Sequence, residues 1–153
     1  MRILVTGGAG LIGSHVCEQA LAAGHEVAAL DDLSNGKREN LPEDVPLFEV
    51  DIRDKDALAK AFADFRPDAV SHQAAQASVS VSVREPLMDA DVNVLGSINV
   101  LEACATHDCA NFVFASTGGA IYGEIAEPEL AAVGRPPIPE SPYAAAKLAV
   151  EGY

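Results

Sequence analysis

Short apolar segments recur along the chain and are separated by longer segments with helical spacing. The apolar segments cover residues 2–6, 26–30, 46–50, 68–72 and 111–116. They are apolar almost throughout rather than alternating with polar residues, which is typical of strands buried on both faces of a parallel sheet. The pattern therefore predicts five parallel strands.

The intervening segments predict helices over residues 11–23 and 55–65, over about 86–106, and from near Tyr143 onward. Gly24 follows the first of these segments, Asp54 precedes the second and Pro67 follows it, as expected at helix ends. Strands that alternate with helices predict an α/β fold with a doubly wound parallel sheet. Residues 32–46 and 123–142 lack periodicity and are expected to be long loops, which are often functional.

Length and charge narrow the possibilities. A chain of 153 residues can form one domain with a real core, so we expect a single domain over residues 1–153. The net charge of -13 repels phosphate backbones and anionic membrane surfaces, so neither a nucleic acid nor a membrane is expected as a partner. Any phosphate that this chain binds must be held by local groups.

The cysteines and the N-terminal segment predict a location. Cys17, Cys104 and Cys109 are odd in number and lack CxxC spacing, so we expect buried thiols in a reducing compartment and no metal site. No apolar stretch has the length of a signal peptide core or a membrane span. The expected location is the cytoplasm.

Three glycines follow the first predicted strand and open the first predicted helix. Gly7 suits the unusual backbone angles of a tight turn, Gly10 would let a diphosphate approach the backbone, and Gly13 would allow close packing. Free amides at the helix start would then face the phosphates. A bare strand-to-helix turn is the alternative, but the motif stands between a strand and a helix, as dinucleotide binding requires.

Acidic residues at the ends of the next strands predict the nucleoside. Asp31 ends the second strand, 18 positions after Gly13, where a carboxylate binds an adenosine ribose. Asp32 adds a charge that would repel a 2′-phosphate, which favours NAD over NADP, although Lys37 and Arg38 lie nearby. Asp51 follows the third strand and would either meet the adenine amino group or cap the next helix, and the sequence leaves both open.

Tyr143 and Lys147 are the main candidates for catalysis. Their i, i+4 spacing on the last predicted helix places both side chains on one face. A neighbouring ammonium group stabilises a tyrosine phenolate, which could take a proton from a sugar hydroxyl while hydride leaves the carbon. The same spacing also occurs on ordinary solvated helices. Ser116 and Thr117 follow the fifth strand, where a hydroxyl could bind the same substrate oxygen.

These segments together resemble the extended short-chain dehydrogenases/reductases, and most closely their UDP-glucose 4-epimerase branch. The resemblance rests on TGGAGLIGSH, DDLSNGKRENLP, VDIRD, HQAAQASV, NVLGSINVLEAC, FASTGGAIYGE and SPYAAAKLAVEGY. They cover essentially the whole chain in the order of the family. The resemblance implies a Rossmann fold, NAD as the cofactor and a nucleotide sugar as the substrate.

The resemblance also implies roles for individual residues. The catalytic residues would be Thr117, Tyr143 and Lys147, of which Tyr143 and Lys147 would also contact the cofactor. The other cofactor contacts would be Gly7, Gly10, Leu11, Ile12 and Gly13 at the diphosphate, Asp31 and Asn35 at the ribose, Asp51 and Ile52 at the adenine, Ala74, Ala75 and Gln76 beside the diphosphate, and Asn93 near the active site.

In such epimerases NAD takes hydride from C4 of a UDP-hexose and returns it to the other face, so the cofactor stays bound. The resemblance further implies a homodimer that pairs the long helix and the tyrosine-bearing helix of two subunits. Family members are about twice as long as this chain, so we expect the later strands and the substrate domain to be missing. Some epimerases have a lysine where this chain has Ala77.

Two alternatives remain at this point. The chain could be an NAD-binding module that turns over no substrate, for which Tyr143 and Thr117 would be unnecessary. It could also belong to a related nucleotide-sugar dehydratase or another epimerase. Dehydratases usually have an acid pair after the catalytic threonine, whereas Gly118 and Gly119 follow Thr117 here, which favours an epimerase.

Overall fold

The structure, a computed structural model, describes residues 1–126, 128–132 and 134–153. The chain divides into two compact units. The first unit comprises Met1–Ala75 and Gly96–Ala115, and the second comprises Gln76–Leu95 and Ser116–Tyr153. The prediction that residues 1–153 act as one domain stays a prediction.

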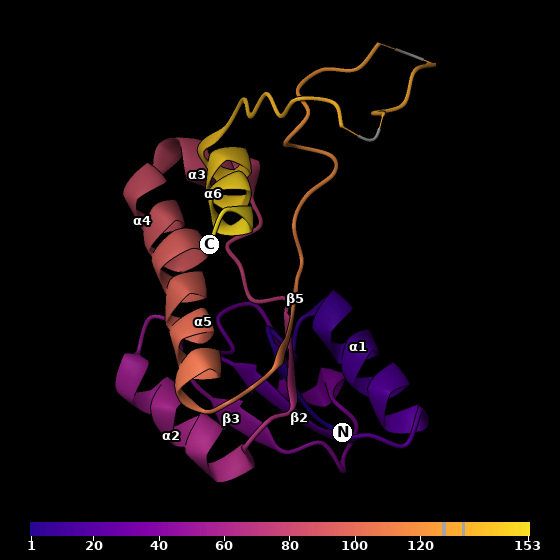
Figure 1. Cartoon of the computed structure of the whole chain (residues 1–153), viewed down its shortest axis with the longest axis vertical. Coiled ribbons are helices and arrows are strands. Elements are labelled where there is room, and N and C mark those ends of the chain that lie inside the picture. Colours follow the sequence, from indigo (N-terminus) through magenta and orange to yellow (C-terminus); the bar gives the residue numbers. More distant parts are fainter. Residues whose placement is uncertain (127, 133) are drawn as a thin grey trace. The chain divides into compact units, whose positions relative to one another are not determined.

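The first unit contains a five-stranded parallel sheet (Figure 1). Its strands are β1 (Arg2–Thr6), β2 (Glu26–Asp31), β3 (Leu47–Glu49), β4 (Ala69–His72) and β5 (Asn111–Phe114), in the order β3-β2-β1-β4-β5. All paired strands are parallel. The doubly wound sheet predicted from the apolar segments is therefore confirmed, with strand ends that differ from the predicted ones by two residues or fewer.

Helices of the first unit cover both faces of this sheet. Figure 1 shows α1 (Leu11–Ala22) on one side, and α2 (Lys55–Phe65) and α5 (Ser97–Thr106) on the other, where they pack against each other. Leu4 and Val5 of β1 and Ala29 and Leu30 of β2 are fully buried, because these strands lie at the centre of the sheet. The continuous apolar character of the segments follows from this two-sided burial.

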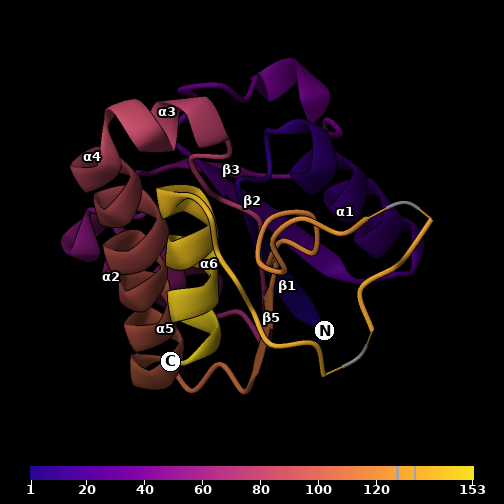
Figure 2. The same cartoon turned by 90° about the horizontal axis from the view of Figure 1, so that it is seen from above.

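The second unit contains α3 (Val79–Arg84), α4 (Pro86–Ala90) and α6 (Pro142–Glu151). Both α3 and α4 pack against α6 (Figure 2). The long helix expected over residues 86–106 is helical in the structure but has a π-helical segment, Asp91–Gly96, between α4 and α5. Such wider turns occur inside α-helices, often at functional sites.

Two elements were absent from the expectations. The 3₁₀ turn η1 (Arg38–Asn40) lies in the first predicted loop. Helix α3 has the sequence VSVSVR, whose alternation is typical of a strand. Ser78 caps its start by accepting from the Val81 amide, the Ser82 hydroxyl donates to the carbonyl of Val79, and the helix packs against α4 and α6. In the described part of the chain, no helix is long and apolar enough to cross a membrane.

Candidate functional site

The glycine loop between β1 and α1 has the geometry expected from its spacing. Gly7 has a φ of +65°, which L-residues with side chains rarely adopt, and a Cβ at this position would lie 2.6 Å from the amide nitrogen of Ala74. A Cβ on Gly13 would lie 2.1 Å from the carbonyl oxygen of Gly7. Both positions therefore require glycine.

The start of α1 has room for an anion. A Cβ on Gly10 would meet the carbonyl oxygen of Gly7 at a tight 3.3 Å and no other described atom within 4 Å, so little fills the space beside Gly10 at the helix start. Helices leave the amides of their first turn without intrahelical acceptors, here those of Leu11, Ile12 and Gly13, and α1 has no acidic residue in that turn. The apolar side chains of Leu11 and Ile12 are 77% and 67% exposed. This end of the helix fits a diphosphate.

Asp31 lies at the carboxyl end of β2 and is only 7% exposed. Its Oδ2 accepts from the Ala9 amide at 3.0 Å, and its Oδ1 accepts from the Leu33 amide at 2.9 Å. An ionised carboxylate has about four acceptor positions, so these two bonds leave capacity for a ribose hydroxyl. Asp31 therefore also holds the glycine loop against the loop that follows β2, a role that its position in the sequence did not reveal.

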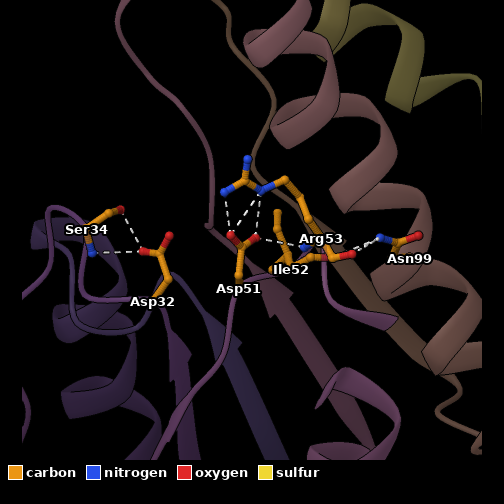
Figure 3. A network of polar contacts seen from close by, with 6 residues as sticks. All are labelled: Asp32, Ser34, Asp51, Ile52, Arg53 and Asn99. Atoms are coloured by element: carbon orange, nitrogen blue, oxygen red, sulfur yellow. Dashed lines mark hydrogen bonds and ion pairs between the residues drawn. The ribbon is translucent and has the colours of Figure 1, made fainter. Parts of the chain in front are cut away.

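The loop after β2 places further predicted residues at this edge of the sheet. Asp32 accepts from both the amide and the hydroxyl of Ser34, at 2.9 and 2.6 Å (Figure 3). Asn35 is exposed. A Cβ on Gly36 would lie 2.8 Å from Oδ1 of Asp31, so glycine lets this loop approach the carboxylate closely.

Asp51 follows β3 and pairs with Arg53 (Figure 3). Its Oδ1 accepts from Nε of Arg53 at 3.0 Å and its Oδ2 from Nη2 at 2.5 Å, and these bonds hold the pKa of Asp51 below its usual range. The cap of α2 is instead Asp54, which accepts from the amides of Asp56 and Ala57. Of the two roles left open for Asp51, helix capping is therefore wrong, and the adenine contact stays a prediction.

Ile52 follows Asp51 and is held from two sides. Asn99 of α5 donates to the carbonyl oxygens of Ile52 and Arg53 at 3.1 and 3.3 Å (Figure 3). The side chain of Ile52 is 5% exposed, and Gly96 leaves the space that it fills. These contacts fix the backbone after β3, where the adenine is expected.

A buried polar chain supports the loop of Ala74 and Ala75. Oγ1 of Thr6 lies 2.6 Å from Nδ1 of His72 and accepts from the Ala74 amide at 3.3 Å. Nε2 of His72 lies 2.9 Å from Oγ of Ser97. Sequence reasoning assigned no role to Thr6 or His72, because nothing local in the sequence shows that β1, β4 and α5 bring them together.

In the second unit, the predicted residues Gln76 and Asn93 contact each other. The Gln76 amide donates to Oδ1 of Asn93, and Nδ2 of Asn93 donates to the Gln76 carbonyl oxygen, both at 2.9 Å. Oδ1 of Asp89 accepts from Nε2 of Gln76 at 2.7 Å and from Nδ2 of Asn93 at 2.9 Å. Sequence reasoning missed Asp89, although its i, i+4 spacing to Asn93 is a signal of a shared helix face.

The three predicted catalytic residues also belong to the second unit. Tyr143 and Lys147 lie on α6, whose N-cap is Ser141, and Lys147 is only 3% exposed. Burial lowers the pKa of Lys147 to about 8, against the opposing effect of the negative charge of Asp89. Thr117 is half-buried in the segment after β5, and the hydroxyl of the preceding Ser116 donates to Glu151.

The predicted site residues thus fall into two sets, each in one unit. The first unit holds Gly7, Gly10, Leu11, Ile12, Gly13, Asp31, Asn35, Asp51, Ile52, Ala74 and Ala75, and the second holds Gln76, Asn93, Thr117, Tyr143 and Lys147. Their roles as cofactor contacts or catalytic groups stay predictions. The described residues include no group of three or more His, Cys, Asp or Glu side chains that could hold a metal ion.

Comparisons with known proteins show which proteins the whole chain resembles. The sequence profile of the NAD dependent epimerase/dehydratase family matches residues 3–153. The chain is 45% identical to UDP-glucose 4-epimerase of Mycolicibacterium smegmatis over 100% of its own length and 50% of that protein.

Two crystal structures show the same similarity. UDP-glucose 4-epimerase of Thermus thermophilus, in complex with NAD, matches with a TM-score of 0.98 and 61% identity, over 100% of this chain and 49% of that one. UDP-glucose 4-epimerase of Thermotoga maritima, with UDP-glucose, matches with a TM-score of 0.95 and 46% identity, over 100% and 50%. The chain thus spans about half the length of the relatives that it matches.

Proposed function

Since the chain belongs to the NAD dependent epimerase/dehydratase family, we propose that it is the NAD-binding half of a nucleotide-sugar 4-epimerase. Its substrate class would be UDP-glucose and UDP-galactose. Each relative named above is a UDP-glucose 4-epimerase, and one of them was crystallised with NAD and another with UDP-glucose. We also propose that the protein is a cytoplasmic homodimer.

The observation that carries the proposal is the geometry of the glycine loop. Gly7 and Gly13 are required by the turn itself, because a Cβ at either position would overlap backbone atoms, whereas a Cβ on Gly10 would make one tight contact, with the carbonyl oxygen of Gly7 at 3.3 Å. Without a ligand, the turn would depend less on glycine at this second position than at the other two. Asp31 at the next strand end then supplies the acceptor for a ribose.

When bound, NAD would supply the hydride acceptor for C4 of the sugar and return the hydride to the opposite face. The residues of this chain would bind and orient the reactants. The Tyr143 phenolate would take the proton of the C4 hydroxyl, and the hydroxyl of Thr117 would donate to the same oxygen. Lys147, as an ammonium group, would bind the nicotinamide ribose and stabilise the phenolate.

Cofactor preference tests the binding half of the proposal. In titration calorimetry of the 153-residue chain, we expect NAD to bind at least about tenfold more tightly than NADP, because the carboxylates of Asp31 and Asp32 repel a 2′-phosphate. Asp32→Asn keeps an acceptor for Ser34 and removes one charge, so it should narrow this ratio. Equal affinity for both cofactors, or no binding of NAD, would contradict the proposal.

A chimera tests the catalytic half. Residues 1–153 joined to the second half of the Thermus enzyme, to which this chain is 61% identical, should turn over UDP-galactose. The chain by itself should bind NAD and show little or no turnover. Tyr143→Phe in the chimera should lower kcat by a factor of about 100 or more, because it removes the acid/base. A folded chimera that binds NAD and has no activity would instead indicate a non-catalytic NAD-binding module.

A further inference from the structure

Asp89 of α4 is a buried carboxylate that none of the predicted catalytic steps uses. It is only 1% exposed. Its Oδ1 accepts from Gln76 and Asn93, whereas its Oδ2 is buried and accepts no hydrogen bond from the described residues. A carboxylate in such a place is costly unless a positive charge lies near it.

The contacts of Oδ1 hold Asn93 in one orientation. The amide nitrogen of Asn93 has two hydrogens, and it donates one to the Gln76 carbonyl oxygen and the other to Asp89. Its Oδ1 accepts from the Gln76 amide, so the Asn93 side chain hydrogen-bonds both the backbone N–H and the backbone carbonyl of Gln76. The side chain of Gln76 is held as well, since its Oε1 accepts from the Ser78 amide at 2.6 Å.

Lys147 supplies a positive charge that interacts electrostatically with Asp89. Helix α6 packs against α3 and α4, and Lys147 is 3% exposed. The other ionisable groups on these helices are Arg84 of α3 and Tyr143 and Glu151 of α6; Arg84 and Glu151 are exposed and Tyr143 is half-buried. Burial lowers the pKa of Lys147 and the charge of Asp89 raises it, so Asp89 favours the protonated ammonium group.

We propose that Asp89 is a positioning residue of the catalytic helix, which orients the Gln76–Asn93 pair through Oδ1 and keeps Lys147 protonated through its negative charge. The inference rests on the proposed function, because only there does the charge of Lys147 serve catalysis. Asp89 itself would contact neither substrate nor cofactor.

Two substitutions separate the hydrogen bonds from the charge. Asp89→Asn retains a side-chain oxygen that can accept from Gln76 and Asn93, but has no negative charge. Asp89→Leu removes the acceptor and the charge together. Glu85→Gln is the matched control, because it removes one carboxylate charge from an exposed position in the same unit.

The effect of the Asp89 charge on the protonation of Lys147 is measured by NMR titration of the lysine side chains labelled with ¹³C at Cε. The chain has only four lysines, Lys37, Lys55, Lys60 and Lys147, and a Lys147→Met spectrum assigns the relevant signal. We expect a midpoint near pH 8 for Lys147 in the wild type and one about a unit lower in Asp89→Asn. Glu85→Gln should leave the midpoint unchanged. If Asp89 had a purely structural role, the titration midpoint of Lys147 would be the same in Asp89→Asn as in the wild type.

The contribution to stability of the hydrogen bonds that Asp89 accepts from Gln76 and Asn93 is measured by thermal unfolding. Asp89→Leu should melt at least about 5 °C below Asp89→Asn, because it leaves the donors of Gln76 and Asn93 unpaired. An unchanged Lys147 midpoint in Asp89→Asn, or equal melting of the two variants, would overturn the proposal. If Asp89→Leu does not fold, the titration of Asp89→Asn decides. Neither measurement involves NAD or a sugar, so the proposal and the proposed function can fail separately.

Discussion

Of the four lysines, Lys147 alone is buried, and this burial distinguishes it from an ordinary residue on a solvated helix face. Its spacing to Tyr143 singled it out in the sequence, but the same spacing occurs on many exposed helices. Burial changes its chemistry, because a desolvated ammonium group loses its proton more readily. Its pKa of about 8 follows from this environment.

The pH dependence of stability should report this burial. Because the pKa of Lys147 is about 8 in the folded state and 10.5 in its ordinary state, the unfolded chain binds more protons between these values, and stability rises with pH there. We expect the unfolding free energy of the wild type, relative to Lys147→Met, to increase by about 3 kcal/mol between pH 7 and 10.5.

Urea unfolding across this pH range provides the measurement. Lys60→Met, a substitution at an exposed position of α2, is the matched control variant. If the difference in unfolding free energy between the wild type and Lys147→Met stayed constant over this pH range, Lys147 would titrate in the folded chain as it does in water.

At the scale of elements, α2 has the bounds that the sequence predicts. Its start follows from Asp54, whose Oδ1 accepts from the amides of Asp56 and Ala57 at 3.1 and 3.0 Å. Arg66, in a left-handed conformation, follows its last residue, Phe65. By contrast, α3 has a strand-like alternation, and the π-helical segment after α4 has no local signal. Capping is a local interaction and can be predicted from the sequence. The backbone conformation of α3 and of the π-helical segment depends instead on the elements that they pack against.

The cap of α2 can be tested directly. Asp54→Ala should lower the unfolding free energy by about 1 kcal/mol, because two amides lose their acceptor. Asp54→Asn should remain close to the wild type, since asparagine caps helices about as well as aspartate. Chemical denaturation of the three proteins measures this difference. Equal destabilisation by alanine and asparagine would mean that the charge of Asp54, rather than its hydrogen bonds, stabilises α2.

At the scale of the whole molecule, the second unit exposes a set of apolar side chains. They are Val79, Val83, Leu87 and Leu95, with exposed fractions of 45%, 61%, 86% and 54%. Exposed apolar groups of this kind favour association. They support the proposal of a homodimer, which the resemblance to the family implies for the long helix and the tyrosine-bearing helix.

The oligomeric state should respond to charges at these positions. We expect the wild type to be a dimer by light scattering and the double variant Leu87→Asp and Leu95→Asp to be a monomer, because burying two carboxylates in an interface is costly. Leu130→Asp is the control, since Leu130 is 89% exposed but lies outside the helices. A monomeric wild type would refute the proposed dimer.

The sequence by itself determined the features that depend on neighbours along the chain. Buried strands read as continuous apolar segments, Gly7, Gly10 and Gly13 mark one turn and the helix that follows, and Asp54 marks a helix start. The three cysteines were also expected to be buried thiols, as they are. Each of these follows from local backbone geometry or from the burial of a whole segment, which a pattern of residue types can express.

Only the tertiary structure decided which polar side chains meet. It pairs Asp51 with Arg53 rather than with the amides of α2, connects Thr6 to His72, and brings Asp89 to Gln76. In the last two cases, packing of segments removes water from the polar groups, so each must find a partner in the protein. Such partners depend on how the segments pack in three dimensions, and a pattern of residue types along the chain cannot express that.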